Sequence, residues 1–482
     1  MAAERRSRVL VVMALLAAQL LLVPAAGAAP KAPTQAVVAL IDTGINPYSP
    51  AFRDRSPLAK MHPSKYIPGY PKSAEALKIT LDVPYQVAMK RDAKLWESVD
   101  ERTLYWIPGT RIIGAISFGA GGTYCPSVTE LPVVNGELST GCEEHKILDD
   151  QGHGSMTASR AAGAPRSLAP NARIVEIEGL GADQVLWAAN QGWIDVNSNS
   201  WGSLVPHPAA AALPEPLFGT RIDSAFKYAS TRMFTAVATG NGTGFVLGAA
   251  PNSSYLNTTM PPGIVNVGGH DNGHMTLWAG APPHVVADAY AGYAATKGTI
   301  APMKPTPWAC CTSAPAPYAS GGATAIVLAA RKILNDHRTG IHKAVVARGK
   351  RGVVKRGPLA DGVFTLDELK RVFFHTAEGR PAAGRDDGLL QWAGEPRAPD
   401  YTQYGPGANP FCVGCTTSQT TWSDAPADFD AFQFIGYGAI NERSIKLANS
   451  VLSGKTALPD RATEDADYAL DQTLRSLLFA AP

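Results

Sequence analysis

The chain has 482 residues, of which 45% are hydrophobic, and its formal net charge is +2 at pH 7. This length corresponds to about three average domains, although a single α/β domain with insertions reaches the same size. The apolar content is sufficient for a large core, and the nearly balanced charge gives no reason to expect a polyanionic partner such as a nucleic acid.

The N-terminus has the composition of a secretion signal. Three arginines within residues 5–8 precede an apolar stretch at 9–23, and Ala-Gly-Ala at 26–28 has the small-x-small form of a cleavage site. We therefore expect residues 1–28 to be removed and the protein to be secreted, either to the extracellular space or to the cell envelope. An uncleaved anchor is the alternative, but the apolar run is short for a spanning helix. We expect no stable membrane insertion after cleavage, and the Ala-rich composition points to a bacterial source.

The first predicted strand is a continuous apolar run at 37–41, VVALI, as in a buried strand of a parallel sheet. Asp42 follows at its carboxyl end, in the sequence Asp-Thr-Gly. Functional sites assemble at such strand ends in open α/β sheets. An aspartate that merely caps a turn or a helix is the ordinary alternative.

A long segment at 54–148, rich in Pro, Gly and aromatic residues, is predicted to be an insertion, and it leads to the sequence Gly-His-Gly around His153. The flanking glycines leave little side-chain crowding, so that another segment or a substrate can approach closely. Small residues from Ala158 to Ala164 predict a tightly packed helix. A histidine with only a structural role is the ordinary alternative.

Helices are predicted at 182–191 and 219–230, and the apolar strand at 234–238 runs into a Gly-Asn-Gly turn at Asn241. Turn chemistry alone explains Asn-Gly. The functional interpretation is an amide donor that stabilises an oxyanion.

Ser313 precedes an Ala-rich apolar run, 323–334, that has the composition of a helix. A helix N-terminus presents free N–H groups and a positive dipole end, and both favour negative charge on a nearby oxygen. A serine that caps the helix is the alternative. Further along, a capping box at Thr365 opens a helix to His375, and 378–430 has the composition of irregular loops.

The four segments occur in the chain order Asp, His, Asn and Ser. In this order they resemble the motifs of the subtilisin-like serine proteases, the subtilases of peptidase family S8. The resemblance implies that Asp42 orients the imidazole, His153 is the general base, Asn241 donates to the oxyanion and Ser313 is the nucleophile. The family's fold is a three-layer, doubly wound, mostly parallel sheet flanked by helices.

Other segments resemble the same family. The sequence at 195–202 is similar to its substrate-binding strand, which assigns Ser200, Trp201 and Gly202 to substrate binding. Similar stretches lie at 168–175, 262–269 and 436–441. We expect the peptidase domain to span 29–455, followed by a C-terminal tail at 456–482.

The function implied is a secreted serine endopeptidase that acts on protein or peptide substrates through an acyl-enzyme. The alternative is a catalytically impaired binding or scaffold protein, because Cys311 and Pro315 depart from the family's nucleophile motif and only residues 29–36 remain for a folding propeptide. A transpeptidase that uses an amine in place of water also fits the sequence. A second alignment would put Ala323 at the nucleophile position, but the first retains Thr312 and Pro317.

The resemblance implies no cofactor for the chemistry and no catalytic metal. Calcium is common in the family, but the sequence has no Asp-x-Asp-x-Asp loop to bind it. An even number of cysteines in an exported protein predicts disulfides, without deciding which residues pair; the six are Cys125, Cys142, Cys310, Cys311, Cys412 and Cys415. The sequence does not determine the oligomeric state.

Overall fold

A computed structural model describes the part of the chain that forms one compact unit from Thr34 onward. The described residues are 33–118, 133–134, 137–138, 146–149, 152–163, 167–201, 205–206, 220–238, 246–247, 263–271, 274–275, 285–288, 290–294, 304–309, 312–348, 354–378 and 437–459. The predicted signal sequence, all six cysteines, Gly202, Asn241 and nearly all of 378–430 lie outside them. So does most of the predicted C-terminal tail.

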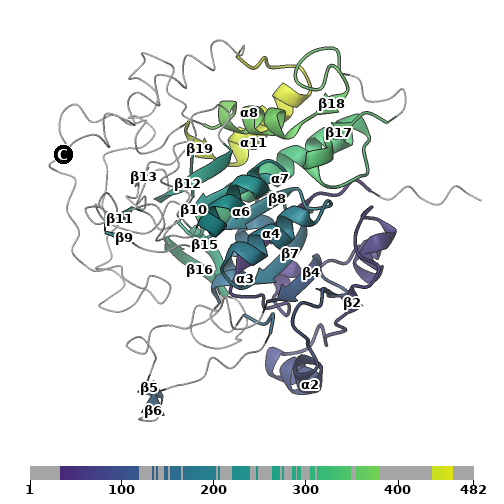
Figure 1. Cartoon of the computed structure of the whole chain (residues 1–482), viewed down its shortest axis with the longest axis vertical. Helices are drawn as coiled ribbons and strands as arrows, with labels where there is room; N and C mark the ends of the chain where they lie inside the picture. Colours follow the sequence, from purple (N-terminus) through teal and green to yellow (C-terminus); the bar gives the residue numbers. More distant parts are fainter. Residues whose placement is uncertain are drawn as a thin grey trace, which may run out of the picture. The chain divides into compact units, whose positions relative to one another are not determined.

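Within these residues an 11-stranded sheet forms the centre of the fold, in the order β19-β14-β12-β10-β8-β1-β7-β4-β3-β2 with β13 beside β12. Every pair from β19 to β4 along this order is parallel, and the antiparallel pairs are β3 with β4 and β12 with β13. Figure 1 shows these strands side by side. The predicted mostly parallel α/β fold is confirmed. The strands are β1 (Val37–Asp42), β2 (Glu75–Ala76), β3 (Tyr105–Trp106), β4 (Ile112–Ser117), β7 (Arg173–Glu178), β8 (Val196–Asn199), β10 (Phe234–Ala238), β12 (Ile264–Asp271), β13 (His274–Met275), β14 (Val285–Asp288) and β19 (Ala439–Ile440).

Helices flank the sheet, and they fall into two packed groups. In the first, α3 (His153–Ala162) packs on α7 (Pro315–Leu334), which also contacts α8 (Leu366–His375) and α11 (Glu442–Leu452). In the second, α4 (Ala182–Asn190) packs on α6 (Thr220–Ser230). All five helices predicted from sequence in this region are present. Shorter elements are η1 (Pro50–Phe52), η2 (Pro57–Lys60), η3 (Pro63–Lys65), η6 (Ile341–Lys343) and the two-stranded pairs β5–β6 (Val133–Val134, Glu137–Leu138), β9–β11 (Val205–Pro206, Val246–Leu247), β15–β16 (Tyr290–Ala294, Lys304–Ala309) and β17–β18 (Val345–Val346, Val363–Phe364).

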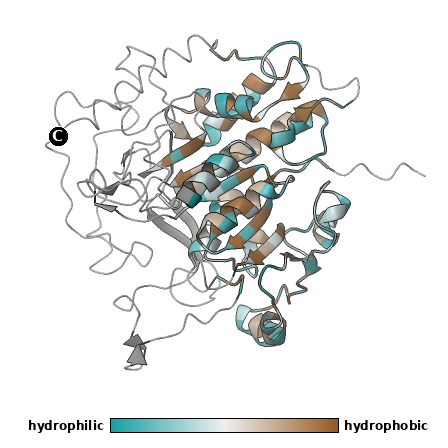
Figure 2. Ribbon diagram, in the orientation of Figure 1, coloured by the Kyte–Doolittle hydropathy of each residue, from teal (hydrophilic) through white to brown (hydrophobic). Residues whose placement is uncertain are grey.

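Coverage by helices explains why β1 is apolar at every position before Asp42. All six of its residues are buried, including Asp42. A strand that is covered on both faces has no solvent-facing positions, so its sequence runs continuously apolar instead of alternating. Figure 2 shows the same pattern, with predominantly hydrophobic strands at the centre of the described fold.

The segment between the Asp and His motifs contributes to the core as well as to loops. It contains α2 (Tyr85–Glu97) and the strands β2, β3 and β4, and all six residues of β4 are buried against β7. An aromatic cluster secures α2, because Trp96 Nε1 donates to the Tyr48 hydroxyl at 2.9 Å and that hydroxyl donates to Asp92 Oδ2 at 2.7 Å. Part of the predicted insertion therefore forms one side of the sheet.

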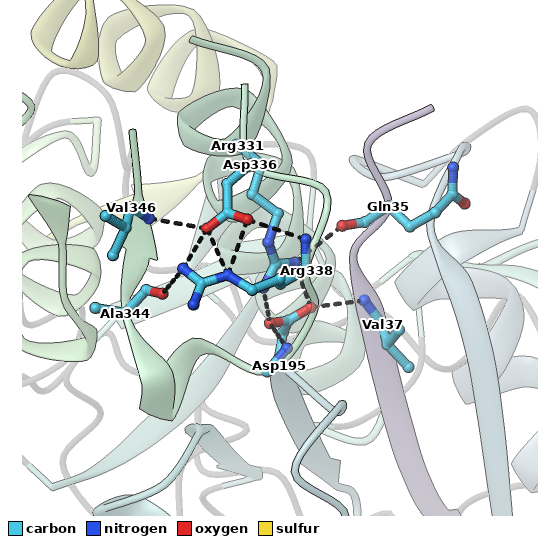
Figure 3. Close-up of polar contacts among 9 residues, drawn as sticks. Gln35, Val37, Asp195, Arg331, Asp336, Arg338, Ala344 and Val346 are labelled. Carbon is cyan, nitrogen blue, oxygen red and sulfur yellow. Dashed lines mark hydrogen bonds and ion pairs between the residues drawn. The ribbon is translucent and has the colours of Figure 1, made fainter. Parts of the chain in front are cut away.

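A buried ion pair joins the beginnings of β1 and β8 to the last turns of α7 (Figure 3). Arg331 donates to both carboxylate oxygens of Asp195, at 2.5 and 2.6 Å, and to the Gln35 carbonyl at 2.9 Å. The same carboxylate accepts the N–H groups of Val37 and Gly340, each at 2.9 Å. Because Asp195 is fully buried and Arg331 is 1% exposed, these bonds are shielded from water, and they fix the start of β1.

Candidate active site

Asp42 and His153 form a hydrogen-bonded pair. Asp42 is the last residue of β1 and His153 is the first of α3. The imidazole Nδ1–H donates to Asp42 Oδ1 at 2.6 Å, and the carboxylate side chain is 2% exposed whereas the imidazole is 21% exposed. The Thr43 N–H donates to Oδ1 at 2.8 Å, and the Thr157 hydroxyl donates to Oδ2 at 3.0 Å. These contacts fix the carboxylate, which in turn selects the imidazole tautomer that leaves Nε2 free to accept a proton.

The two glycines beside His153 have separate structural roles. Gly152 adopts φ +87°, a left-handed conformation that favours glycine, and ends the preceding loop where α3 begins. Gly154 allows a close backbone crossing, because a Cβ built there would lie 2.1 Å from the Gly44 carbonyl oxygen. The prediction that these glycines permit close packing is confirmed.

Asp149 organises the same loop, a role that sequence reasoning did not assign. Its carboxylate is fully buried and accepts the Thr43 hydroxyl at 2.8 Å and the N–H groups of Gly152 and Ser155 at 2.7 and 2.6 Å. Burial raises the pKa of Asp149 to about 6; the hydrogen bonds from Ser155 and Thr43 oppose this, and the Asp42 charge adds to it. The sequence contained a clue to this role, because an aspartate just before a helix commonly accepts the free N–H groups of the first helical turn.

The electrostatic environment makes His153 a stronger base than an ordinary histidine. Burial lowers the pKa of the imidazole, but the charge and hydrogen bond of Asp42, together with the charge of Asp149, outweigh it and raise the pKa above 6.5. A base with a pKa near the working pH is suited to accept a proton during reaction.

Ser313 and Ser200 form a second pair. The Ser313 hydroxyl donates to the Ser200 carbonyl at 3.3 Å, and the Ser200 hydroxyl donates to the Ser313 carbonyl at 2.9 Å. Ser313 is 4% exposed and lies two residues before Pro315, the first residue of α7. The residue at the N-cap position is Ala314, whose side chain makes no capping bond. The alternative in which Ser313 merely caps the helix is therefore wrong.

The register of the sheet places the two pairs next to each other. β1 and β8 are paired in parallel, with Ile41 opposite Asn199. Asp42 and Ser200 are the next residues along these two strands, so the Asp42–His153 and Ser200–Ser313 pairs lie at adjacent strand ends. This edge of the sheet is the one where the sequence predicted that a site would assemble.

Helix α3, which begins at His153, is in close contact with helix α7, which begins two residues after Ser313. A Cβ built on Gly321 of α7 would lie 2.4 Å from the Ala161 carbonyl oxygen of α3. The guanidinium of Arg160 lies over the Tyr318 ring, 4.1 Å from its centroid, and donates to the Asp288 carbonyl at 2.7 Å. The contact fixes the relative position of the two helix N-termini, where His153 and Ser313 lie.

Comparison with known proteins agrees with this arrangement. The family model described as Peptidase_S8, Subtilase family, matches residues 34–390. The chain belongs to the subtilase family. Membership of this family implies serine peptidase activity and peptide substrates. No curated protein matches this subtilase.

Solved structures of several subtilisin-like proteases align with most of this subtilase. A serine-to-alanine mutant of the protease domain of PatA is 13% identical with a TM-score of 0.39, and the alignment covers 89% of this chain and 99% of that one. The epidermin leader peptide processing serine protease EpiP from Staphylococcus aureus is 13% identical with a TM-score of 0.41, over 88% and 77% of the two chains. The prenylagaramide maturation protease PagA is 13% identical with a TM-score of 0.41, over 89% and 96%.

The remaining residues predicted for the site of this subtilase are only partly described. Trp201 packs against Phe226 of α6 in a tilted arrangement, with ring centroids 5.6 Å apart. Gly202 and Asn241 lie outside the described residues. Ala323, the nucleophile position in the second alignment, is fully buried well inside α7, whereas Ser313 lies beside the strand ends.

The described residues of this subtilase contain no group of three or more His, Cys, Asp and Glu side chains arranged to hold a metal ion. In the same residues, no helix has both the length and the apolar composition that crossing a membrane requires.

Proposed function

We propose that this subtilase is a secreted serine endopeptidase in which Asp42, His153 and Ser313 act as the catalytic triad and Asn241 donates to the oxyanion. The observation that carries the proposal is the placement of the Asp42–His153 and Ser200–Ser313 pairs at adjacent strand ends. The pairs supply the three chemical roles of acyl transfer, which are an oriented base, a carboxylate and a nucleophilic hydroxyl.

In the first half of the reaction, the Ser313 hydroxyl oxygen attacks the carbonyl carbon of the scissile peptide. Its proton passes to Nε2 of His153, and the Asp42 carboxylate stabilises the imidazolium that forms. The imidazolium then protonates the leaving amine, which departs and leaves an acyl group on Ser313. Water activated by the same imidazole hydrolyses this ester in the second half.

The proposed reaction requires the Ser313 hydroxyl to change its hydrogen-bond partner. The Ser313 hydroxyl donates to the Ser200 carbonyl in the structure, at 3.3 Å. Its proton has to turn to the imidazole before attack, and the long donor–acceptor distance makes the existing bond easy to exchange. Hydroxyl groups rotate to suit the available acceptor.

The positive end of α7 supports the oxyanion. Ser313 precedes the first helical residue, where backbone N–H groups lack intrahelical partners. The Ser313 N–H and the Asn241 amide are the proposed donors, and loss of one such donor costs on the order of 10² to 10³ in rate. We propose that Ser200, Trp201 and Gly202 contact the substrate backbone.

Labelling with a serine-directed fluorophosphonate tests the proposal. We expect the exported, folded protein to acquire an adduct that Ser313→Ala abolishes, because only an activated hydroxyl reacts at a useful rate. Ser320→Ala is the matched control, since Ser320 lies in α7, which follows Ser313, and its hydroxyl donates to the Ala316 carbonyl at 2.9 Å. If the wild type acquires no Ser313-dependent adduct, the peptidase assignment fails and the binding or scaffold alternative replaces it.

Export is tested separately by N-terminal sequencing of the protein recovered from the medium or envelope. We expect the mature chain to begin at Ala29, after the proposed cleavage site. A mature chain that retains residues 1–28 would contradict the signal assignment without affecting the proposed chemistry.

A further inference from the structure

Glu176 is a buried carboxyl group that the proposed reaction does not use. It lies on β7, with Leu40 of β1 and Ala115 of β4 as its register partners. The residue has no exposed surface, and no hydrogen bond of good geometry reaches either side-chain oxygen among the described residues, although the Gly44 N–H lies close enough to oppose the effect of burial. A buried carboxyl without well-formed hydrogen bonds is costly.

The Glu176 carboxyl lies directly against the backbone that carries the Asp42–His153 pair. A Cβ built on Gly154 would lie 3.1 Å from Glu176 Oε1 and 2.1 Å from the Gly44 carbonyl oxygen. Gly154 is the neighbour of His153, and Gly44 follows Asp42 by two residues. The carboxyl therefore fills the space beneath the point where these two segments cross.

The charged and titratable groups around Glu176 are mostly acidic. Asp42 faces it from β1, Asp149 from the loop before α3 and Glu178 from β7 itself, while His153 lies on α3 next to Gly154. Burial raises the pKa of Glu176 well above 4.5, and the charges of Asp42 and Asp149 raise it further against the opposing Gly44 N–H. A buried carboxyl in such surroundings retains its proton instead of adding another negative charge.

We propose that Glu176 is a positioning residue for the serine peptidase reaction, in which its uncharged carboxyl supports the crossing of Gly44 and Gly154 and leaves Asp42 as the principal charge acting on His153. This inference rests on the proposed function. An ionised Glu176 would repel Asp42 and strain the crossing. It would also raise the pKa of His153 further, so that the imidazolium gives up its proton to the leaving amine less readily.

The test compares the wild type with Glu176→Gln, which keeps the shape of the side chain and cannot ionise. We expect kcat/KM of the variant to stay within about threefold of wild type near neutral pH, and to fall several-fold less than wild type as the pH is raised above neutral. Glu178→Gln is the matched control from the same strand, because Glu178 already accepts the Ile147 N–H at 2.9 Å. We expect this control to keep the wild-type alkaline limb.

Two outcomes of this assay overturn the inference. Superimposable alkaline limbs for wild type and Glu176→Gln would show that ionisation of Glu176 does not reach the site. A loss of more than about 10²-fold at neutral pH in a folded Glu176→Gln protein would show that the site needs a charged carboxylate at this position.

A stability measurement tests the protonation state without relying on peptidase activity. Because the folded state binds the Glu176 proton more tightly than the unfolded state, the free energy of unfolding of wild type should fall relative to Glu176→Gln as pH rises above 4.5. Parallel pH dependences would overturn the inference. This measurement separates its failure from failure of the proposed function, since it needs no Ser313-dependent labelling.

Discussion

Substitution of Gly321 by alanine tests whether the contact between α3 and α7 aligns the site. The added Cβ would lie 2.4 Å from the Ala161 carbonyl oxygen, about 1 Å short of an ordinary contact. Both atoms belong to or extend from helix backbone, so the helices have to separate. Overpacking of this kind costs about 1–3 kcal/mol, and the better helix propensity of alanine offsets about 1 kcal/mol. We expect a net loss of up to about 2 kcal/mol in the free energy of unfolding.

The neighbouring residue provides the control for this prediction. A Cβ built on Gly322 would lie 2.8 Å from Ile440 Cγ2, a side-chain atom that yields more easily than a carbonyl. We expect Gly322→Ala to change the free energy of unfolding by less than about 1 kcal/mol.

Urea unfolding and peptidase kinetics measure the two consequences. A displacement of about 1 Å between catalytic groups costs on the order of 10² in rate, so we expect kcat/KM of folded Gly321→Ala to fall by about that factor. Gly322→Ala should stay within a few-fold of wild type. The reasoning is refuted if Gly321→Ala is as stable and as active as Gly322→Ala.

Two further predictions concern the Asp42–His153 pair and the buried ion pair. The acidic limb of kcat/KM should lie above pH 6.5, because the raised pKa of His153 keeps the base protonated below that value. Asp42→Asn should move this limb to lower pH and reduce kcat on the order of 10⁴-fold. An unmoved limb would show that Asp42 does not set the pKa of His153. Arg331→Met should lower the free energy of unfolding by about 3–5 kcal/mol, because Asp195 would remain buried and charged without its partner. Urea unfolding measures this loss, and a value below about 1 kcal/mol would contradict the prediction.

Much of the framework around the site was predictable from local sequence. The apolar run before Asp42 predicted a buried strand, the capping box at Thr365 predicted the start of α8, and the Gly-His-Gly sequence predicted close packing at His153. Such features depend on the residues immediately around them, because propensity, capping and backbone freedom are local properties.

Other features depended on residues that are distant in the chain. Asp149 precedes α3 and accepts N–H groups of its first turn, but its hydrogen bond from the Thr43 hydroxyl depends on a segment 106 positions away. The helix of Ser313 begins at Pro315, eight residues before the apolar run that predicted it, since Pro and polar residues in its first turns are buried by packing rather than favoured by composition. Part of the segment between the Asp and His motifs proved to be core, because β4 pairs with β7.

The sequence by itself determined the order of the chemical groups, the family they resemble and most of the elements that carry them. Only the tertiary structure decided that Ser313 pairs with Ser200, that the two pairs occupy adjacent strand ends, and that Glu176 lies buried against the crossing of Gly44 and Gly154. The physical reason is that strand register and burial are set by contacts between distant segments. Distances, desolvation and pKa values follow from that register and not from any single stretch of sequence.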